Sequence, residues 1–413
     1  MKLFKAANLP RDAAEDELQA GDIYFSLGQY ENALHAYRQV LSLAPDDSEL
    51  RCRVFSHMAR TYATRGQSAP AAKYSEEALS LSAGLSGATQ AEAFLVRGEA
   101  LQNRDPVKAA ELFQRAQEHF AQVGDKNGQA RALLLLAYIR FRSQRADASR
   151  LAGQALQLWS EIDDLDGVAQ ARFALGLFAA VTGEFETAQC NYQRALPVFH
   201  IAGDKDNEAI TLNGLGYVAR ERGDPETSLG SYQNAKTIFA AVNDQLGAVE
   251  AISGIGKTLS VLERKRELLA LFREKLRLAR EIKIPALEAS ALADMASVYE
   301  IEHRYAKAQA LYEKALALYK SEQREYGEGD VLMALARMQV EQGHDSQALP
   351  LLKTARPLKD KTGQIEDLAR IDYAMADIYR RLNRLDEARA AIEKTIAVIE
   401  TQRLKIASFD SRA

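Results

Sequence analysis

The sequence is poor in cysteine, tryptophan and proline, with two, one and nine of these residues among 413. Cys52 and Cys190 lie far apart, in different copies of the repeat described below, so we expect no disulfide between them. A reducing, cytoplasmic setting is the expectation that follows. Because prolines are few while Ala, Leu, Glu, Arg and Gln are abundant, helix is favoured throughout, and no strand pattern competes with it.

Long apolar runs are also missing. No segment reaches the ~18 apolar residues that span a bilayer, so we do not expect membrane insertion. The start, Met1-Lys2-Leu3-Phe4, lacks an apolar core of signal-peptide length. The formal net charge of −4 gives no general case for nucleic-acid binding. Residues 264–283 are a local exception, with eight Lys or Arg and three Glu, and form either a solvated helix face or a contact for an acidic partner.

Motifs that carry chemistry are weak. The six histidines are scattered without metal-ligand spacing, so we expect no metal site, and we expect no cofactor. Cys190 has no histidine partner and is interpreted as a small buried or half-buried side chain rather than a nucleophile. Residues 251–258 fit a relaxed phosphate-loop pattern, but the repeat places Gly256 inside a helix whose N–H groups are already used. The sequence therefore predicts no catalytic residue.

What the chain does have is an internal repeat. A small residue recurs every forty residues, at Gly176, Gly216, Gly256, Ala296, Ala336 and Ala376. A fixed period in this range is typical of repeat proteins, in which each unit buries its apolar face against its neighbours.

Each unit is predicted to be a pair of helices. In the clearest copy, Phe173 and Leu177 have the spacing of one helix face, and Gly183 can supply the left-handed residue that ends the helix. A second helix follows, in which Tyr192 and Phe199 lie on one face with small residues between them. Ten such units can be counted, the third and fourth being the weakest.

The small residues, the aromatic plug and the helix-ending glycine together resemble the tetratricopeptide repeat, in its longer variant of about forty residues. The resemblance implies an all-α, right-handed superhelical solenoid of about ten antiparallel helix pairs. Members of this family bind proteins or extended peptides and perform no chemistry themselves. We expect an N-terminal extension over residues 1–13, the repeat array over 14–400 and a C-terminal helix or linker over 401–413.

A narrower resemblance covers residues 391–413. This stretch is similar to the helix that links tetratricopeptide arrays to a caspase-like CHAT peptidase domain in bacterial proteins. Its helix shows Ile392, Ile396 and Ile399 on one face, so we expect something to cover it, either a downstream catalytic domain or a second copy of the chain.

The family resemblance also implies a binding surface, because the first helix of each pair lines the inner groove. The groove positions map here to Arg60, Arg140, Asn213, Tyr217, Arg220, Glu250, Lys257, Arg337, Tyr373, Asp377 and Arg380. Positive charge predominates among them, so an extended segment carrying Asp or Glu is the expected ligand, while the plain alternative is a row of solvated side chains.

Three functions remain open on the sequence alone. The chain is a non-catalytic binding scaffold, the regulatory or sensor region of a CHAT-type peptidase, or the sensor or adaptor of a bacterial transcriptional or signalling regulator. The partner is expected to be a protein or peptide rather than nucleic acid or membrane.

Overall fold

The computed structural model describes residues 2–362 and 365–410, and it describes side chains from Arg11 onward except Val398 and those beyond Glu400. Within these residues the regular structure consists of twenty helices, with no strand. The predicted all-α class is therefore confirmed.

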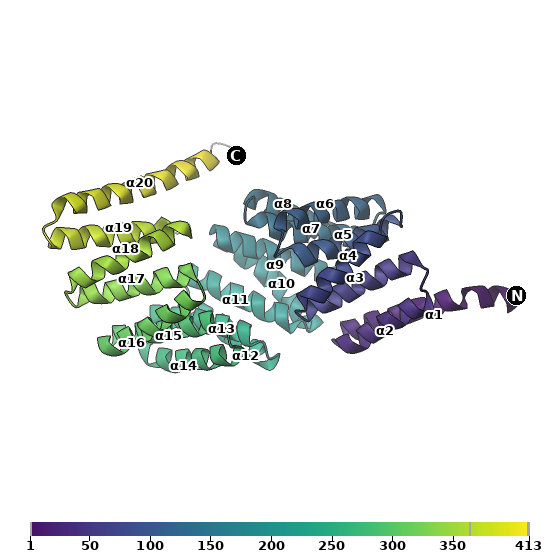
Figure 1. The fold of residues 1–413 in the computed structure, drawn as a ribbon, viewed down its shortest axis with the longest axis horizontal. Coiled ribbons are helices and arrows are strands. Elements are labelled where there is room, and N and C mark those ends of the chain that lie inside the picture. The colour runs from purple at the N-terminus through teal and green to yellow at the C-terminus, as the bar shows by residue number, and fades with distance from the viewer. Residues whose placement is uncertain (1, 363–364, 411–413) are drawn as a thin grey trace. The chain divides into compact units, whose positions relative to one another are not determined.

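The chain divides into two compact units, residues 1–222 and 223–413, which we describe separately (Figure 1). Unit 1 holds α1 (Lys2–Ser26), α2 (Tyr30–Leu43), α3 (Ser48–Thr64), α4 (Ser68–Leu81), α5 (Gly87–Leu101), α6 (Pro106–Gln122), α7 (Lys126–Phe141), α8 (Arg145–Ser160), α9 (Leu165–Thr182), α10 (Phe185–Ala202) and α11 (Lys205–Glu221). Unit 2 holds α12 (Pro225–Ala241), α13 (Gln245–Val261), α14 (Lys265–Ile282), α15 (Pro285–Ile301), α16 (Tyr305–Ser321), α17 (Glu325–Glu341), α18 (Asp345–Lys361), α19 (Ile365–Arg381) and α20 (Leu385–Asp410).

In each unit a helix packs against the next one along the chain, as expected for stacked helical hairpins. In unit 1 the first helices of successive pairs also touch one another, from α1 to α3 and onward through α5, α7 and α9 to α11. Among the described residues, the second helices of unit 1 do not contact one another to a comparable degree. The first helices therefore form the more tightly packed layer of the unit, while the groove itself stays a prediction.

Small residues hold the helices in register because they receive the aromatic rings of neighbouring helices. The recurring positions from Gly176 to Ala376 are all buried, which confirms the predicted register. A Cβ added at Gly176 would lie 2.8 Å from the ring of Tyr192, and one added at Gly167 would lie 2.4 Å from the indole of Trp159. Because no Cβ fits there, glycine allows these helices to approach closely.

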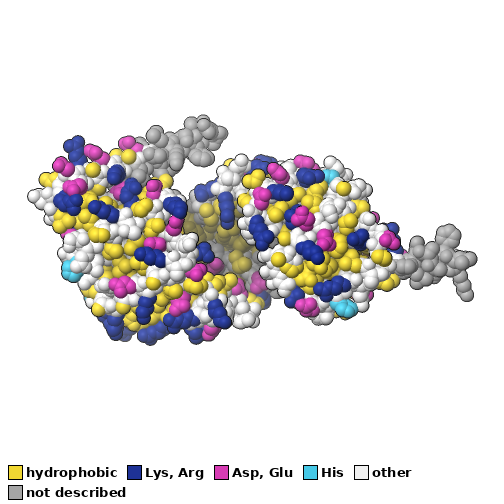
Figure 2. Space-filling view, in the orientation of Figure 1, with side chains coloured by type: hydrophobic (Ala, Val, Ile, Leu, Met, Phe, Trp, Pro, Cys, Tyr) yellow, Lys and Arg dark blue, Asp and Glu magenta, His cyan; other side chains and the backbone are white. Residues whose placement is uncertain are grey.

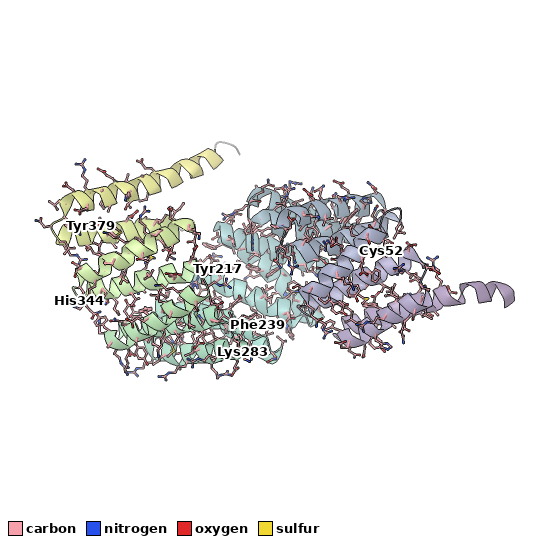
Figure 3. The ribbon with its side chains drawn as sticks, in the orientation of Figure 1. Cys52, Tyr217, Phe239, Lys283, His344 and Tyr379 are labelled. Carbon is pink, nitrogen blue, oxygen red and sulfur yellow. The ribbon has the colours of Figure 1, made fainter. Side chains whose placement is uncertain are left out.

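The helix ends reveal a finer period than the sequence suggested. A residue with positive φ ends helices at twenty-residue intervals, at Asp163, Gly183, Gly203, Gly223, Asn243, Glu263, Lys283, His303, Gln323, Gly343 and Asn383. Gly183 has φ +83°, as predicted, whereas Lys283 (labelled in Figure 3) reaches +60° despite its side chain. The helices α8 to α17, and α19, are therefore each followed by a residue in the left-handed conformation, and the forty-residue repeat consists of two twenty-residue modules.

The strained turns predict a gain in stability. Gln323 and Glu263 are exposed and have φ of 52° and 55°, where a Cβ is unfavourable. Replacing each by glycine is expected to raise the free energy of unfolding by about 0.5–1 kcal/mol, after the entropy that glycine adds to the unfolded chain. Thermal unfolding followed by circular dichroism measures the change. The neighbouring Glu322→Gly, at φ −94°, is the matched control and should give no gain.

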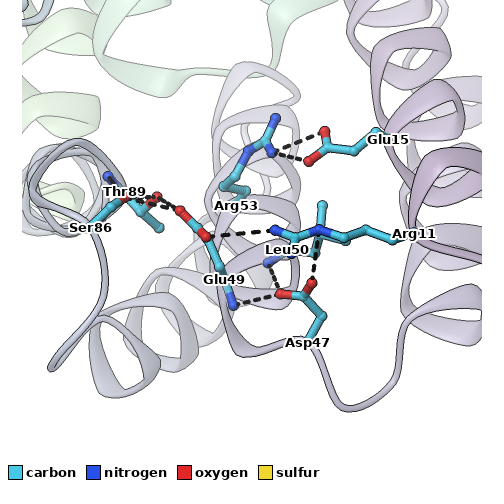
Figure 4. Close-up of polar contacts among 8 residues, drawn as sticks. All are labelled: Arg11, Glu15, Asp47, Glu49, Leu50, Arg53, Ser86 and Thr89. Atoms are coloured by element: carbon cyan, nitrogen blue, oxygen red, sulfur yellow. Dashed lines mark hydrogen bonds and ion pairs between the residues drawn. The ribbon is translucent and has the colours of Figure 1, made fainter. Parts of the chain in front are cut away.

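Aspartates and ion pairs fix the ends of the first helices. Asp47 accepts hydrogen bonds from backbone N–H groups of α3, and Asp164 does so for α9, so each caps the start of its helix. Figure 4 shows how the same region ties three first helices together. Arg53 on α3 donates to Glu15 on α1 at 2.7 Å, and Glu49 accepts hydrogen bonds from Ser86 and Thr89 at the start of α5.

Residues 251–258 and most of the basic segment 264–283 lie in helices of unit 2. Gly256 lies inside α13 against the ring of Phe272, so residues 251–258 form a helix interior and not a phosphate loop. The basic segment is α14, and Figure 2 shows Lys and Arg along the lower edge of unit 2, where Figure 1 places this helix. Lys275 is the exception on α14, since it is buried and paired with Asp294 at 2.6 Å.

The prediction for Cys190 was wrong, because its side chain is exposed. Cys190 and Tyr192 are two residues apart, which is about 200° around a helix, so the buried ring of Tyr192 directs Cys190 outward. No helix in the described ranges has the combination of length and apolarity needed to cross a bilayer. The helix α1 begins at Lys2 and α20 ends at Asp410, while the division at residues 13 and 400 stays a prediction.

Candidate functional site

The predicted groove residues all lie on first helices. Arg60 is on α3, Arg140 on α7, and Asn213, Tyr217 and Arg220 on α11, all in unit 1. Glu250 and Lys257 are on α13, Arg337 on α17, and Tyr373, Asp377 and Arg380 on α19, all in unit 2. In unit 1 they are spread over α3, α7 and α11, and in unit 2 over α13, α17 and α19.

The predicted excess of positive charge is largely balanced within the chain. Each arginine of the set has a carboxylate partner: Arg60 with Glu92, Arg140 with Asp147, Arg220 with Glu221, Arg337 with Glu300, and Arg380 with Asp377. An acidic ligand would have to displace these partners, so the number of arginines alone does not define an anion-binding surface.

Two rows of side chains run across the first helices of unit 1. One row lies six residues after the helix N-caps, at Arg53, Glu92, Arg131 and Gln170, counted from residues 47, 86, 125 and 164. The other row lies thirteen residues after the N-caps and holds Arg60, Glu99, Tyr138, Leu177 and Tyr217, counted from 47, 86, 125, 164 and 204. These rows define the first-helix groove of unit 1.

The charged half of the groove lies on α3, α5 and α7. The Glu92 carboxylate accepts a hydrogen bond from Arg60 and lies 3.7 Å from Arg131. Burial raises the pKa of Glu92, but the attraction of Arg60 and Arg131 and the Arg60 hydrogen bond outweigh burial and lower it. Glu99 has no such bond: burial raises its pKa, Arg60 and Arg131 only partly oppose the rise, and Glu92 adds to it.

Arg131 has binding capacity that the fold does not use. Its guanidinium lies 3.7 Å from Glu92 and 4.0 Å from Glu99, beyond hydrogen-bond distance, and makes no hydrogen bond to any described residue. It lines a cavity of about 320 Å³ together with Glu99, Leu134, Leu135, Tyr138, Trp159, Gln170, Phe173, Phe199 and Asn207. A guanidinium presents five N–H donors, so Arg131 can receive a carboxylate or a carbonyl in this cavity.

The other half of the groove, on α7, α9 and α11, is uncharged and aromatic. Burial raises the pKa of Tyr138 to about 12, so its hydroxyl stays protonated and can donate a hydrogen bond. Asn213 on α11 has a buried Oδ1 with no hydrogen-bond partner in the described chain. Figure 3 labels Tyr217 on the same helix, where its ring lies 5.4 Å from the guanidinium of Arg220.

Arg337 has a structural role in unit 2. Its Nε and Nη2 donate to the two oxygens of Glu300 at 2.9 and 3.0 Å, joining α17 to α15. Tyr312 on α16 donates to the same carboxylate at 2.8 Å, and Glu300 is 5% exposed. The Glu300 carboxylate therefore has hydrogen-bond partners on both neighbouring helices and joins α15, α16 and α17.

Two further groups of predicted residues line hollows. Arg140 borders a cavity of about 920 Å³ between the turn joining α5 to α6 and the turn joining α7 to α8. Tyr373, Asp377 and Arg380 border another of about 550 Å³, between α19 and α20. Lys257 is exposed, and burial raises the pKa of Glu250, with Asp244 adding to the rise.

The sequence prediction missed Glu99, Tyr138, Arg131 and Gln170. Glu99 and Tyr138 occupy the same place on their helices as Arg60 and Tyr217, which were predicted. The N-caps of α5, α7 and α9 are 39 residues apart, at 86, 125 and 164, so these helices fall out of a forty-residue register. Counting from the capping Ser or Asp would have found them.

The architecture of stacked helical hairpins with a polar first-helix face defines an α-solenoid. Family profiles described as tetratricopeptide repeats match residues 21–53, 287–361 and 369–400. The chain therefore contains tetratricopeptide repeats, as the sequence resemblance implied. The search of curated proteins gave no match.

Solved structures with the same fold include a Rap protein, a quorum sensor and a signal-transduction ATPase. A Rap protein complexed with Competence and Sporulation Factor has a TM-score of 0.54 and 14% identity, with 94% of this chain and 98% of that chain covered. The apo quorum sensor NprR from B. thuringiensis has a TM-score of 0.58 and 13% identity, with 94% and 99% covered. A signal-transduction ATPase with a tetratricopeptide-repeat sensor, from Pyrococcus horikoshii, has a TM-score of 0.62 and 14% identity, with 77% and 50% covered.

Proposed function

We propose that this chain is a non-catalytic scaffold that binds an extended peptide segment in the first-helix groove of unit 1. The carrying observation is the guanidinium of Arg131, which lines a cavity of about 320 Å³ and makes no hydrogen bond to any described residue, its nearest carboxylates being Glu92 at 3.7 Å and Glu99 at 4.0 Å. A scaffold role in a cytoplasmic setting also agrees with the tetratricopeptide repeats.

The ligand we propose carries a carboxylate next to apolar or aromatic residues. Arg131 receives the carboxylate, as a side chain or a free C-terminus, by charge-assisted hydrogen bonds. The adjoining residues lie over Tyr138 and Phe173, which line the same cavity. The predicted preference for Asp or Glu is kept, but it rests on Arg131 and not on the arginines first assigned.

A peptide selection tests this function. Random short peptides displayed on phage are selected on the full-length chain, and the affinity of a recovered peptide is measured by fluorescence anisotropy. The Arg131→Gln variant is expected to bind it at least about tenfold more weakly, because the charge-assisted hydrogen bonds are lost. Failure to recover any binding peptide would contradict the proposed function.

Two comparisons locate the effect in the groove. Arg194→Gln, an exposed arginine on the second helix α10, should leave the affinity unchanged. Glu99→Gln should strengthen binding, because it removes a carboxylate that competes with the ligand for Arg131 at 4.0 Å. A recovered peptide that binds the Arg131→Gln variant as well as the native chain would place the site elsewhere.

A sensor or adaptor role is the biological setting we propose for this binding. The solved structures of similar fold include a quorum sensor and the sensor part of a signal-transduction ATPase, and the chain covers half of that ATPase. In such a role the bound peptide changes how the scaffold contacts an effector protein.

Association with a CHAT-type peptidase is the narrower form of this proposal. Its support is the sequence resemblance of residues 391–413, and the side chains of 401–413 lie outside the described residues. The coding sequence downstream of Ala413 decides it: a His-Gly segment and a later Cys nucleophile support the peptidase. A helix-turn-helix in the adjoining sequence would instead support the sensor of a transcriptional regulator.

A further inference from the structure

The last helix pair of unit 2 has an open apolar groove. It lies between α19 and α20, has a volume of about 550 Å³, and is lined by Tyr373, Ala376, Leu385, Ala388 and Ile392 together with four charged residues. Tyr373 is 65% exposed and Leu385 is 61% exposed, and no described helix covers them. Further along α20, Ile396 and Ile399 are 50% and 52% exposed.

The repeat shows what kind of element fits this groove. Forty residues earlier, the equivalents of Ala376, Ala388 and Ile392 are Ala336, Ala348 and Leu352 on α17 and α18, and all three are buried. They are covered by α19, which packs Ile371, Ile378 and Tyr379 into the same cluster. Figure 3 labels Tyr379 on this helix. The open groove is therefore the place where the next helix of the stack would lie.

Among the positions at which the last helix pair differs from the preceding pair, two on α20 bear on the chemistry of the occupant. On α18, Arg356 donates to Asp372 of α19 at 2.7 Å, and Lys359 lies 3.0 Å from Asp367 of α19. The equivalents of these two cations on α20 are Ile396 and Ile399. The covering helix must therefore present apolar residues where α19 presents aspartates, because a buried carboxylate there would lose its partner.

The helix α20 itself presents such a stripe. Leu385, Ile392, Ile396 and Ile399 are large exposed apolar residues of this helix and lie within about 60° of one another around its axis, with Arg389 and Glu393 beside them. The charges beside the stripe are paired within the helix, Arg389 with Glu393 at 2.9 Å and Arg384 with Glu387. Two such helices therefore meet without a net repulsion between their flanks.

We propose that a second copy of this chain covers the groove, with the two α20 helices packed antiparallel about a twofold axis. An axis between Thr395 and Ile396 places Ile392 of one copy opposite the partner's Ile399. The helix has 26 residues and is about 39 Å long, which is long enough for an isologous interface of roughly 800 Å² per copy.

The oligomeric state tests this inference. Light scattering after size-exclusion chromatography, over a hundredfold range of concentration, is expected to show the 413-residue chain moving from one to two copies. Ile396→Glu and Ile399→Glu should each hold it at one copy at every concentration, because a carboxylate would be buried without a partner. Ile201→Glu, at the most exposed isoleucine of unit 1, is the matched control and should dimerise as the native chain does.

A single copy at every concentration in the native chain would overturn the inference, as would an Ile396→Glu variant that still dimerises. If the glutamate variants lose helix content, a cysteine provides the second test. In a Cys190→Ser background, Ile396→Cys lies near the proposed axis and is expected to form a disulfide-linked dimer on mild oxidation. Absence of that dimer would also contradict the inference. The peptide affinity of unit 1 is measured separately, so failure of the dimer is distinguishable from failure of the proposed function.

Discussion

Replacing Phe178 by alanine is expected to lower the free energy of unfolding of unit 1 by about 3–5 kcal/mol. The ring is 1% exposed and lies on α9, where it stacks on Phe141 of α7 at a centroid distance of 4.3 Å. Its edge meets the ring of Tyr138 at 5.7 Å, so Phe178 also supports a side chain of the proposed binding groove. Alanine would leave a cavity between two first helices that the backbone can only partly close.

Urea unfolding of the full-length chain measures this loss. The single tryptophan, Trp159, is buried in unit 1, so its fluorescence follows that unit. Phe178→Leu is the matched control and should cost less than about 1.5 kcal/mol, because most of the volume is kept. A loss below about 1 kcal/mol for Phe178→Ala would show that the aromatic contacts between α7 and α9 are unimportant.

The second prediction concerns two glycines inside helices of unit 2, for which we expect opposite signs. Gly254 on α13 lies against the preceding helix α12, and a Cβ added there would lie 2.3 Å from the ring of the buried Tyr232. Gly230 on α12 has open space around it, with no atom within 4 Å of an added Cβ. Alanine gains about 1 kcal/mol of helix propensity at either position, but only Gly254→Ala must displace a buried ring.

The two variants are therefore expected to differ by about 2–3 kcal/mol in the free energy of unfolding. Gly230→Ala should stabilise the chain by up to about 1 kcal/mol, and Gly254→Ala should destabilise it. Denaturant unfolding followed by circular dichroism measures both. Equal stabilisation by the two substitutions would mean that the close approach of glycine to aromatic rings does not set the helix register.

The helix pairs and their small residues were predictable from sequence because they depend on local spacing. The recurring positions from Gly176 to Ala376 lie on one face of each first helix, and the same face is buried in every copy. Gly183 was predictable for the same reason, since a glycine at the end of an apolar pattern adopts the left-handed conformation. Residues such as Lys283 and Gln323 were not, because their conformation is imposed by the stacking of the helices around them.

The candidate site was only partly predictable. The arginines were assigned to a ligand because sequence shows their charge but not the partner that neutralises it, which for Arg60 and Arg337 lies on another helix, 32 and 37 residues away. Arg131 was overlooked although it is the cation left without a hydrogen bond in the described groove. Arg131 makes no hydrogen bond to Glu92 because Arg60 already donates one to that carboxylate. This arrangement exists only once the helices are packed.

The most direct test of the binding account is a crystal structure of the chain with a peptide selected on it. Binding in the first-helix groove of unit 1 predicts peptide density along α7, α9 and α11, with a peptide carboxylate within hydrogen-bond distance of the Arg131 guanidinium. Density on the second helices, or a peptide that leaves Arg131 without contact, would contradict it.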